Sequence, residues 1–205
     1  MKKNLAESFS LSFHPLFLPF YIMLFAFVLP IFEVQTIGSS LQFYILIIVG
    51  LATVMLPLAS MVYFKKKGII SSFEMQNRNE RTTPYIYTII HYGIITYLFY
   101  SIDIFPILIP LLMAIPTVII ITLLILNTQI KVSAHSAGMG SLNAILFVLM
   151  QTYYLDILIP LLVSLLLSII VIASRKYLKA HNWPEIIIGY AVGLTITLGL
   201  AYWIL

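Results

Sequence analysis

Long apolar runs, each about the length needed to cross a bilayer, follow one another along almost the whole chain. A transmembrane helix needs about 20 predominantly apolar residues, and a soluble domain of this size does not require several such runs. The composition agrees, because 61% of the 205 residues are hydrophobic and only 9% are charged. The sequence therefore predicts a single integral membrane domain over residues 1–205, an all-α polytopic helix bundle with about six or seven transmembrane helices.

Polar loops and single polar residues divide the apolar sequence into seven expected spans. Lys2 and Lys3 precede the first run, which is as long as a full span and lacks a small-residue cleavage site. We therefore interpret it as a helix and not as a signal peptide. The expected spans cover residues 15–36, 41–64, 84–102, 104–126, 137–155, 157–173 and 184–205.

Prolines and glycines should shape two of these spans. Pro106, Pro110 and Pro116 lie in the fourth expected span, where neighbouring helices can satisfy the carbonyls that proline leaves free, so we expect a bent helix. Gly189 and Gly193 form a GxxxG pair in the last span. Such pairs allow two helices to approach closely, and we expect internal packing here rather than dimerisation.

The basic residues gather at one end of the expected spans. All eleven Lys and Arg residues fall in the N-terminus and in three loops, residues 65–83, 127–136 and 174–183. The opposite side holds Glu33, Asp103 and Asp156 and no basic residue. The positive-inside rule then predicts a cytoplasmic N-terminus and cytoplasmic basic loops in a bacterial inner (plasma) membrane. Because this charge is modest and lies in loops, no nucleic-acid partner is expected.

The loop between the last two spans concentrates the candidate chemistry. Five residues separate Arg175 from His181, and Asn182 then caps a helix that has Pro184 in its first turn and Glu185 three residues after the cap. Glu185 is thus a candidate for a capping box, and Arg175 for a basic residue at the membrane face. The alternative makes His181 a nucleophile, Glu185 its orienting carboxylate and Arg175 a phosphate clamp.

Two further loops on the same side add basic residues and a second histidine. Arg78 and Arg81 precede the third expected span, and Lys131, Ser133 and His135 precede the fifth. Guanidinium groups can hold the oxygens of a phosphate ester, on which charge spreads in the transition state. Two histidines can divide the roles of nucleophile and general acid, so the three loops together are typical of a phosphoryl-transfer site.

No cofactor and no metal site are expected. The chain has no cysteine, and its two aspartates lie in separate single-residue turns. A metal-dependent phosphotransferase or prenyltransferase would need an acidic cluster to hold magnesium, so we discard that class. We expect His91, inside the third span, to be neutral and structural, although an intramembrane histidine is a functional candidate by default. His14 is expected to anchor the chain at the membrane interface.

The three loops resemble the three signature segments of the type 2 phosphatidic acid phosphatase superfamily, whose patterns are KxxxxxxRP, PSGH and SRxxxxxHxxxD. The third segment matches in every spacing, from Ser174 and Arg175 through His181 to Glu185, with glutamate in place of aspartate. The resemblance extends from Arg78 to Gly189, about half of the chain.

The other two segments match less completely. In the second, Ser133, Ala134 and His135 correspond to SGH, with alanine in place of glycine. In the first, two threonines separate Arg81 from the proline, and Glu74 stands where the pattern has lysine. The loops are also similar to those of short bacterial members with ERxxPY and KxSAH sequences.

This resemblance implies a metal-independent lipid phosphate phosphatase that acts through a phosphohistidine intermediate. By the resemblance, His181 attacks phosphorus, Glu185 orients its imidazole and His135 protonates the leaving alkoxide. Substrate binding is expected from Arg175, Arg81, Arg78, Ser133 and Lys131, and Arg78 or Lys131 would replace the missing lysine.

The implied partners are the bilayer and a phosphorylated lipid, whose phosphate reaches the basic loops while its tails stay in lipid. Phosphatidate, phosphatidylglycerol phosphate, a polyprenyl phosphate or diphosphate and a phosphorylated glycolipid all fit. The alternative is a non-catalytic lipid-binding or transport protein that keeps a degenerate phosphatase site. The sequence leaves the substrate and the oligomeric state open.

Overall fold

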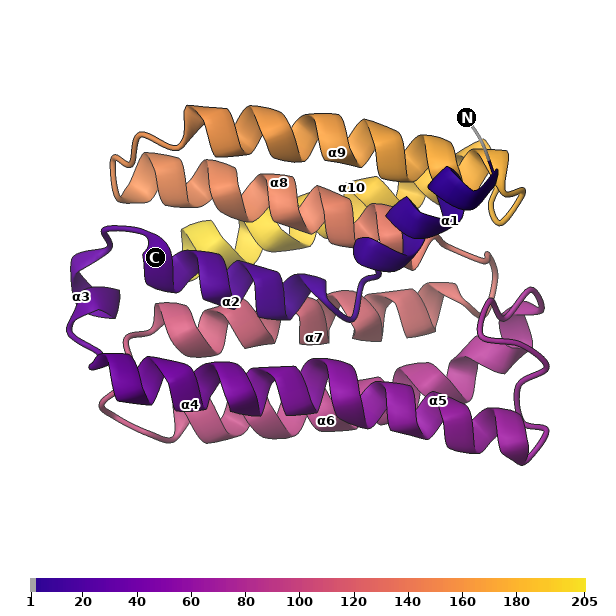
Figure 1. Ribbon diagram of the computed structural model, residues 1–205, viewed down its shortest axis with the longest axis horizontal. Helices are drawn as coiled ribbons and strands as arrows, with labels where there is room; N and C mark the ends of the chain where they lie inside the picture. Colours follow the sequence, from indigo (N-terminus) through magenta and orange to yellow (C-terminus); the bar gives the residue numbers. More distant parts are fainter. Residues whose placement is uncertain (1–2) are drawn as a thin grey trace.

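The computed structural model describes residues 3–205, and every regular element in that part of the chain is helical. The long helices run side by side, with their connections at the two ends of the molecule (Figure 1). The α-helices are α1 (Lys3–Ser12), α2 (Leu18–Val28), α3 (Phe32–Gln35), α4 (Ser39–Gly50), α5 (Leu56–Lys66), α6 (Thr82–Tyr100), α7 (Leu108–Leu126), α8 (Ala134–Thr152), α9 (Leu158–Tyr177) and α10 (Trp183–Ile204). The predicted all-α class is confirmed.

Four helical segments of the described chain are long and apolar enough to cross a membrane: Ser39–Lys66, Leu108–Leu126, Leu158–Tyr177 and Trp183–Ile204. The helices α6 and α8 equal α7 in length, with 19 residues each, but they are more polar. In α8 the polar side chains of His135, Ser136, Ser141 and Asn143 are buried. This helix therefore lies inside the bundle, where neighbouring helices and not lipid surround its polar groups.

The expected first span, residues 15–36, is wrong as a single helix. The helix α2 has only 11 residues and ends at Val28, because Leu29 precedes Pro30 and adopts an extended conformation (φ −70°, ψ 145°). The side-chain amide of Gln35 folds back and donates to the carbonyls of Phe27 and Leu29 at 3.0 and 2.8 Å. A helix of this length covers about 16 Å, roughly half of the hydrocarbon core.

The second expected span is confirmed as one continuous helical segment, with a π-helical turn at Leu51–Met55 joining α4 to α5. Proline has no N–H, so Pro57 leaves the carbonyl of Thr53 without its usual helical donor. The hydroxyl of Tyr92 on α6 donates to that carbonyl at 3.3 Å. This hydrogen bond attaches α6 to the irregular turn.

The fourth expected span is shorter than predicted, since α7 begins only at Leu108. Pro106 therefore precedes the helix, and Pro110 lies in its first turn, where a missing N–H costs nothing. Only Pro116 lies inside the helix, so the expectation that all three prolines bend the span is wrong.

The helices α8 and α10 are held in direct backbone contact by glycines. A Cβ atom on Gly193 would clash with the backbone of Ala137, and one on Gly189 would clash with Ser136 and Ser133. A Cβ atom on Gly140 of α8 would likewise clash with the backbone of Tyr190. The prediction of internal packing for the GxxxG pair is confirmed, and this close contact brings the first turns of α8 and α10 together.

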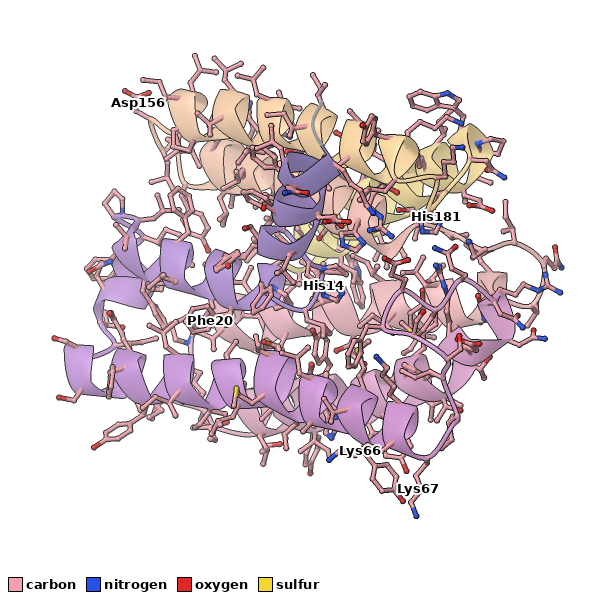
Figure 2. All side chains as sticks on the ribbon, turned by 45° about the vertical axis from the view of Figure 1, so that its right-hand side comes forward. His14, Phe20, Lys66, Lys67, Asp156 and His181 are labelled. Atoms are coloured by element: carbon pink, nitrogen blue, oxygen red, sulfur yellow. The ribbon has the colours of Figure 1, made fainter. Side chains whose placement is uncertain are left out.

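The two ends of the bundle differ in charge. Lys66, Lys67 and His181 lie at one end and Asp156 at the other (Figure 2). The connections after α5, α7 and α9, which hold the three basic loops, lie together at the end that also holds the beginning of α1 (Figure 1). The N-terminal Lys3 is described there, whereas Lys2 lies outside the described residues.

Candidate functional site

The centre of the candidate site is a histidine held by a carboxylate one helical turn away. The Nδ1 atom of His181 lies 2.8 Å from Oε2 of Glu185 and 3.1 Å from the carbonyl oxygen of Lys131. Asn182 caps α10 and forms a full capping box with Glu185, whose Oε2 also accepts from the Asn182 backbone N–H at 3.1 Å. Glu185 therefore caps the helix and orients His181 at the same time.

These contacts fix the tautomer of His181. Both partners of Nδ1 are oxygen acceptors, so Nδ1 carries the proton and Nε2 of the neutral ring keeps its lone pair. Burial, followed by the charge of Arg81, lowers the pKa of His181 to about 4, although the hydrogen bond that His181 donates to Glu185 opposes both effects. At neutral pH the ring is thus unprotonated at Nε2, the state that a nucleophile requires.

Arg81 brings the first of two buried guanidinium groups to Nε2 of His181. Its Nη2 lies 3.5 Å from that nitrogen, Nη1 donates to the carbonyl of Val132 at 3.0 Å, and Nε donates to the carbonyl of Met75 at 3.2 Å. Arg81 ends a short 3₁₀ turn, Arg78–Arg81, and is only 5% exposed. The backbone of two separate loops therefore fixes the position of this cation.

Arg175 supplies the second guanidinium from the last turn of α9. It is 9% exposed, whereas Lys176 and Lys179 of the same loop are exposed, so the expectation of a membrane-face residue is wrong for Arg175. Its Nη1 donates to the hydroxyl of Ser10 at 2.7 Å, and its Nε is buried without a hydrogen-bond partner among the described residues. That Nε is a donor available to a ligand oxygen.

Neither guanidinium forms an ion pair within the described chain, although the carboxylates of Glu7 and Glu74 also line the cavity and the negative charge of Glu74 interacts favourably with Arg175. The ion pairs found among residues 3–205 join Lys3 to Glu7 and His181 to Glu185, and neither involves Arg81 or Arg175. A buried charge without a partner is costly, since burial removes its hydration. Two such cations around one histidine therefore favour an anionic ligand between them.

Ser10 of α1 connects His135 to Arg175. The Nε2 of His135 lies 3.0 Å from the Ser10 carbonyl oxygen and 3.3 Å from the Ser10 hydroxyl oxygen. A carbonyl can only accept, so Nε2 of His135 carries a proton and donates it to Ser10. His135 lies in the first turn of α8 and is 8% exposed.

His14 was expected to be an interfacial anchor, but it packs inside the site. Its ring lies edge-on to that of His135, with 5.0 Å between the centroids. Burial and, to a smaller extent, the nearby charge of Arg175 lower the pKa of His14 to about 4, so the ring is neutral at pH 7. The backbone N–H of Leu16 donates to its Nδ1 at 3.3 Å, which places the proton of the neutral ring on Nε2.

One cavity of about 650 Å³ is lined by Ser10, His14, Arg81, His135, Arg175 and His181, but not by Glu185. Its charged end is formed by Arg81, His135, Arg175 and His181, with Ser10 and His14 beside them. The remaining wall is mostly aliphatic and aromatic and comes from α2, α5, α6, α7 and α8. The cavity therefore joins an end that carries guanidinium and imidazole groups to a largely apolar interior.

The other three predicted site residues lie away from the cavity lining. Ser133 is fully buried and caps α8 by accepting from the N–H of Ser136 at 3.4 Å. The Nζ of Lys131 donates to the carbonyl of Gln76 at 3.3 Å. Burial is the main effect that lowers the pKa of Lys131, and the positive charge of Arg81 adds to it. Arg78 is half-buried at the start of the 3₁₀ turn, where its carbonyl accepts from Asn127. A direct role for these three in binding remains a prediction.

Sequence reasoning missed the contribution of Ser10 and His14. Ser10 gives no motif signal, and it meets His135 and Arg175 across 125 and 165 residues of chain. His14 could have been suspected only as one of the four histidines of the chain.

Within residues 3–205, no group of three or more His, Cys, Asp or Glu side chains is placed to hold a metal ion. His91, on α6, does not line the cavity, and its Nδ1 is buried with no hydrogen-bond partner among the described residues.

Comparisons with protein-family models, with curated proteins and with solved structures find no match for this chain.

Proposed function

We propose that this protein is a metal-independent lipid phosphate phosphatase, which hydrolyses a phosphomonoester or diphosphate of a lipid through a phosphohistidine intermediate. One observation carries the proposal: the buried guanidinium of Arg81 lies 3.5 Å from the unprotonated Nε2 of a carboxylate-bound histidine, and the buried Arg175, whose Nε has no hydrogen-bond partner among the described residues, lines the same largely apolar cavity. Charged donors suit phosphoryl oxygens, and the apolar wall suits a lipid.

In the first step, His181 Nε2 forms a bond to phosphorus while the bond between phosphorus and the lipid oxygen breaks. Arg81 and the free Nε of Arg175 hold the other phosphoryl oxygens, and Glu185 stabilises the positive charge that develops on the ring. His135 gives a proton to the leaving oxygen from a doubly protonated ring. The anionic phosphate has to stabilise that imidazolium, because burial and the charges of Arg175 and His14 hold the pKa of His135 well below its usual value in the protein without substrate. Since the Ser10 carbonyl accepts that proton in the structure, the leaving oxygen has to approach Ser10.

In the second step, water attacks phosphorus, the bond to His181 breaks, and His135 takes a proton from the water. The products are the lipid alcohol and inorganic phosphate. The phosphorylated histidine formed between the steps should be labile in acid and stable in base. Recovery of a phosphorylated residue with the opposite behaviour would contradict a histidine nucleophile.

The decisive test measures release of inorganic phosphate by purified protein from a panel of lipid phosphates, with a chelator present. We expect turnover that the chelator does not reduce and that His181→Ala abolishes. The matched control is Lys66→Ala, because Lys66 is exposed and lies outside the cavity lining. If no member of the panel is hydrolysed although lipid still binds, the protein is a lipid-binding or transport protein with a degenerate site.

We propose an inner-membrane protein with six spans, namely the four apolar segments together with α6 and α8. The short α2 would then reach only about halfway through the membrane. Excess Lys and Arg at the site end favours a cytoplasmic site and N-terminus, since the opposite loops carry Glu33, Asp103 and Asp156.

A thiol at residue 69 tests this orientation in a chain that has no cysteine. Ile69 is 43% exposed in the loop after α5, so Ile69→Cys should be accessible at the site end. We expect a membrane-impermeant thiol reagent to label it only after the cells are opened. Labelling in intact cells would place the site on the outer face.

A further inference from the structure

The cavity that begins at the charged site continues deep into the bundle along three helices. It is lined from Arg81, directly before α6, to Tyr92 on α6, from Leu123 to Leu112 on α7, and from Ala134 to Ile145 on α8. Each stretch is 12 residues long, which corresponds to about 15–17 Å at 1.5 Å per residue. The lining residues on each of these three sides therefore indicate the same depth for the cavity.

This depth matches the thickness of one leaflet. The hydrocarbon core of a bilayer measures about 30 Å, so a cavity about 15 Å deep that starts at the interface ends near the membrane centre. The wall is mostly apolar over this length, with Leu112, Ile115, Ile145 and the aromatic Tyr92 among its lining residues. The side chains of Leu112, Ile145 and Tyr92 are at most 3% exposed, so they close the deep end of the cavity away from the surrounding lipid.

We propose that this cavity binds a hydrocarbon chain of the substrate inside the helix bundle, with Leu112 and Ile145 setting the chain length that it accepts. The inference rests on the proposed function and changes one expectation from the sequence, in which the tails stay in lipid. The substrate class is an amphiphile with a terminal phosphate whose chain enters between α6, α7 and α8. Glu7, Ser10 and Leu11 of α1 line the cavity beside the charged end, so α1 covers the place where head group and chain meet.

The first test uses a series of alkyl phosphates that increase by one CH₂ and are kept monomeric in water. We expect kcat/KM to rise by about fourfold for each CH₂ that the cavity buries. It should level off for chains longer than about 15 Å, where the cavity ends. A kcat/KM that does not depend on chain length, in a protein that releases phosphate, would overturn the chain site and leave the phosphatase intact. No phosphate release from any substrate would instead contradict the proposed function.

Two variants should shorten the accepted chain. Leu112→Phe and Ile145→Phe add volume at the deep end, so kcat/KM should level off at a shorter chain while the shortest substrates keep their wild-type value. The control is Leu166→Phe on α9, which makes the same change at a side chain that is 61% exposed. A control that shifts the chain length as much as the cavity variants would overturn the assignment.

Binding of the alkyl chain can also be measured without turnover and without enlarging a buried side chain. An alkyl phosphate with a photoreactive group at the chain end should label α7 and α8 near Leu112 and Ile145 in the His181→Ala protein. Labelling confined to exposed residues of α9, such as Leu166, would place the chain in the surrounding lipid or detergent and overturn the inference. This measurement does not depend on whether the enlarged side chains allow folding.

Discussion

The two sides of the candidate site are built in different ways. On one side, His181 and Glu185 are four residues apart at the start of α10, and local helix geometry brings them to 2.8 Å. On the other side, Ser10 meets His135 and Arg175 only because α1 packs against α9 and beside α8. The first arrangement follows from spacing in the sequence, whereas the second requires the whole bundle. A motif therefore reveals the histidine and its carboxylate but not the groups that surround them.

We expect the largest loss of activity from substitutions of His181 and Glu185, the pair that local helix geometry brings together. His181→Ala removes the atom proposed to bond to phosphorus, so phosphate release should fall below detection. Glu185→Gln keeps the capping oxygen but removes the charge that stabilises the imidazolium, and we expect a loss of about 100-fold or more. The measurement is single-turnover phosphate release. Near wild-type turnover in His181→Ala would exclude it as nucleophile.

His135→Ala tests the other histidine and should also reduce turnover by about 100- to 10,000-fold, because it removes the general acid. A substrate with a good leaving group, such as an aryl phosphate, needs little protonation and should regain much of this loss. It should not rescue His181→Ala. Equal rescue of both variants would contradict the division of roles between the two histidines.

The two arginines of the 3₁₀ turn provide a matched pair of substitutions. Arg81 lines the cavity and is buried, whereas Arg78 is half-buried outside it. Hydrogen bonds to charged groups contribute about 1.5–3 kcal/mol, so Arg81→Gln should lower kcat/KM by roughly 10- to 150-fold. Arg78→Gln should cost less than Arg81→Gln and more than Lys66→Ala if it replaces the family's lysine. Equal, mild effects of all three would mean that the loop only attracts anionic head groups.

The pH dependence of kcat/KM reports the protonation of His181. Burial and Arg81 lower its pKa to about 4, so the free ring keeps its lone pair throughout the neutral range. The test uses an aryl phosphate and the His135→Ala protein, in which the general acid does not titrate, and corrects for the second ionisation of the substrate at about pH 6. Its kcat/KM should then stay constant as the pH falls from 7 to about 5, and decline as the pH passes through about 4. Phosphate release measured in buffers of equal ionic strength gives this profile. A remaining decline centred near 6.5 would show that His181 is not buried beside Arg81.

We expect the smallest change in kinetics from substitution of Ser10, which reaches the site only through the packing of α1. Ser10→Ala removes one neutral acceptor from Arg175 but leaves the backbone carbonyl that holds His135. A hydrogen bond to a charged group contributes about 1.5–3 kcal/mol, but the substrate phosphate can accept from the Nη1 that Ser10→Ala leaves unpaired. KM should therefore rise by less than about 10-fold, with little change in kcat. The control is Ser8→Ala, since the Ser8 hydroxyl bonds only to the carbonyl of Asn4 on the same helix. An unchanged KM in Ser10→Ala would remove α1 from the site.

Proline chemistry explains where the predicted spans failed. The apolar run of residues 15–36 is long enough for a span, but Pro30 forces Leu29 into an extended conformation and ends α2. In the second span, by contrast, Pro57 is tolerated because Tyr92 donates to the carbonyl of Thr53 that it leaves free. Both prolines are visible in the sequence. Only the tertiary structure decides which of them receives a compensating donor.

The sequence by itself determined the helical class, the approximate positions of the long helices and the pair of His181 and Glu185. These features depend on apolar run length, on capping and on the i, i+4 geometry of one helix, all of which are local. The tertiary structure decided which basic residues are buried: Arg81 and Arg175 enter the cavity, while Arg78 and Lys131 stay outside its lining. The tertiary structure also brings Ser10 and His14 into the site and gives the cavity its deep apolar end. The physical reason is that burial and cavity shape arise from the packing of helices distant in sequence, which no local pattern encodes.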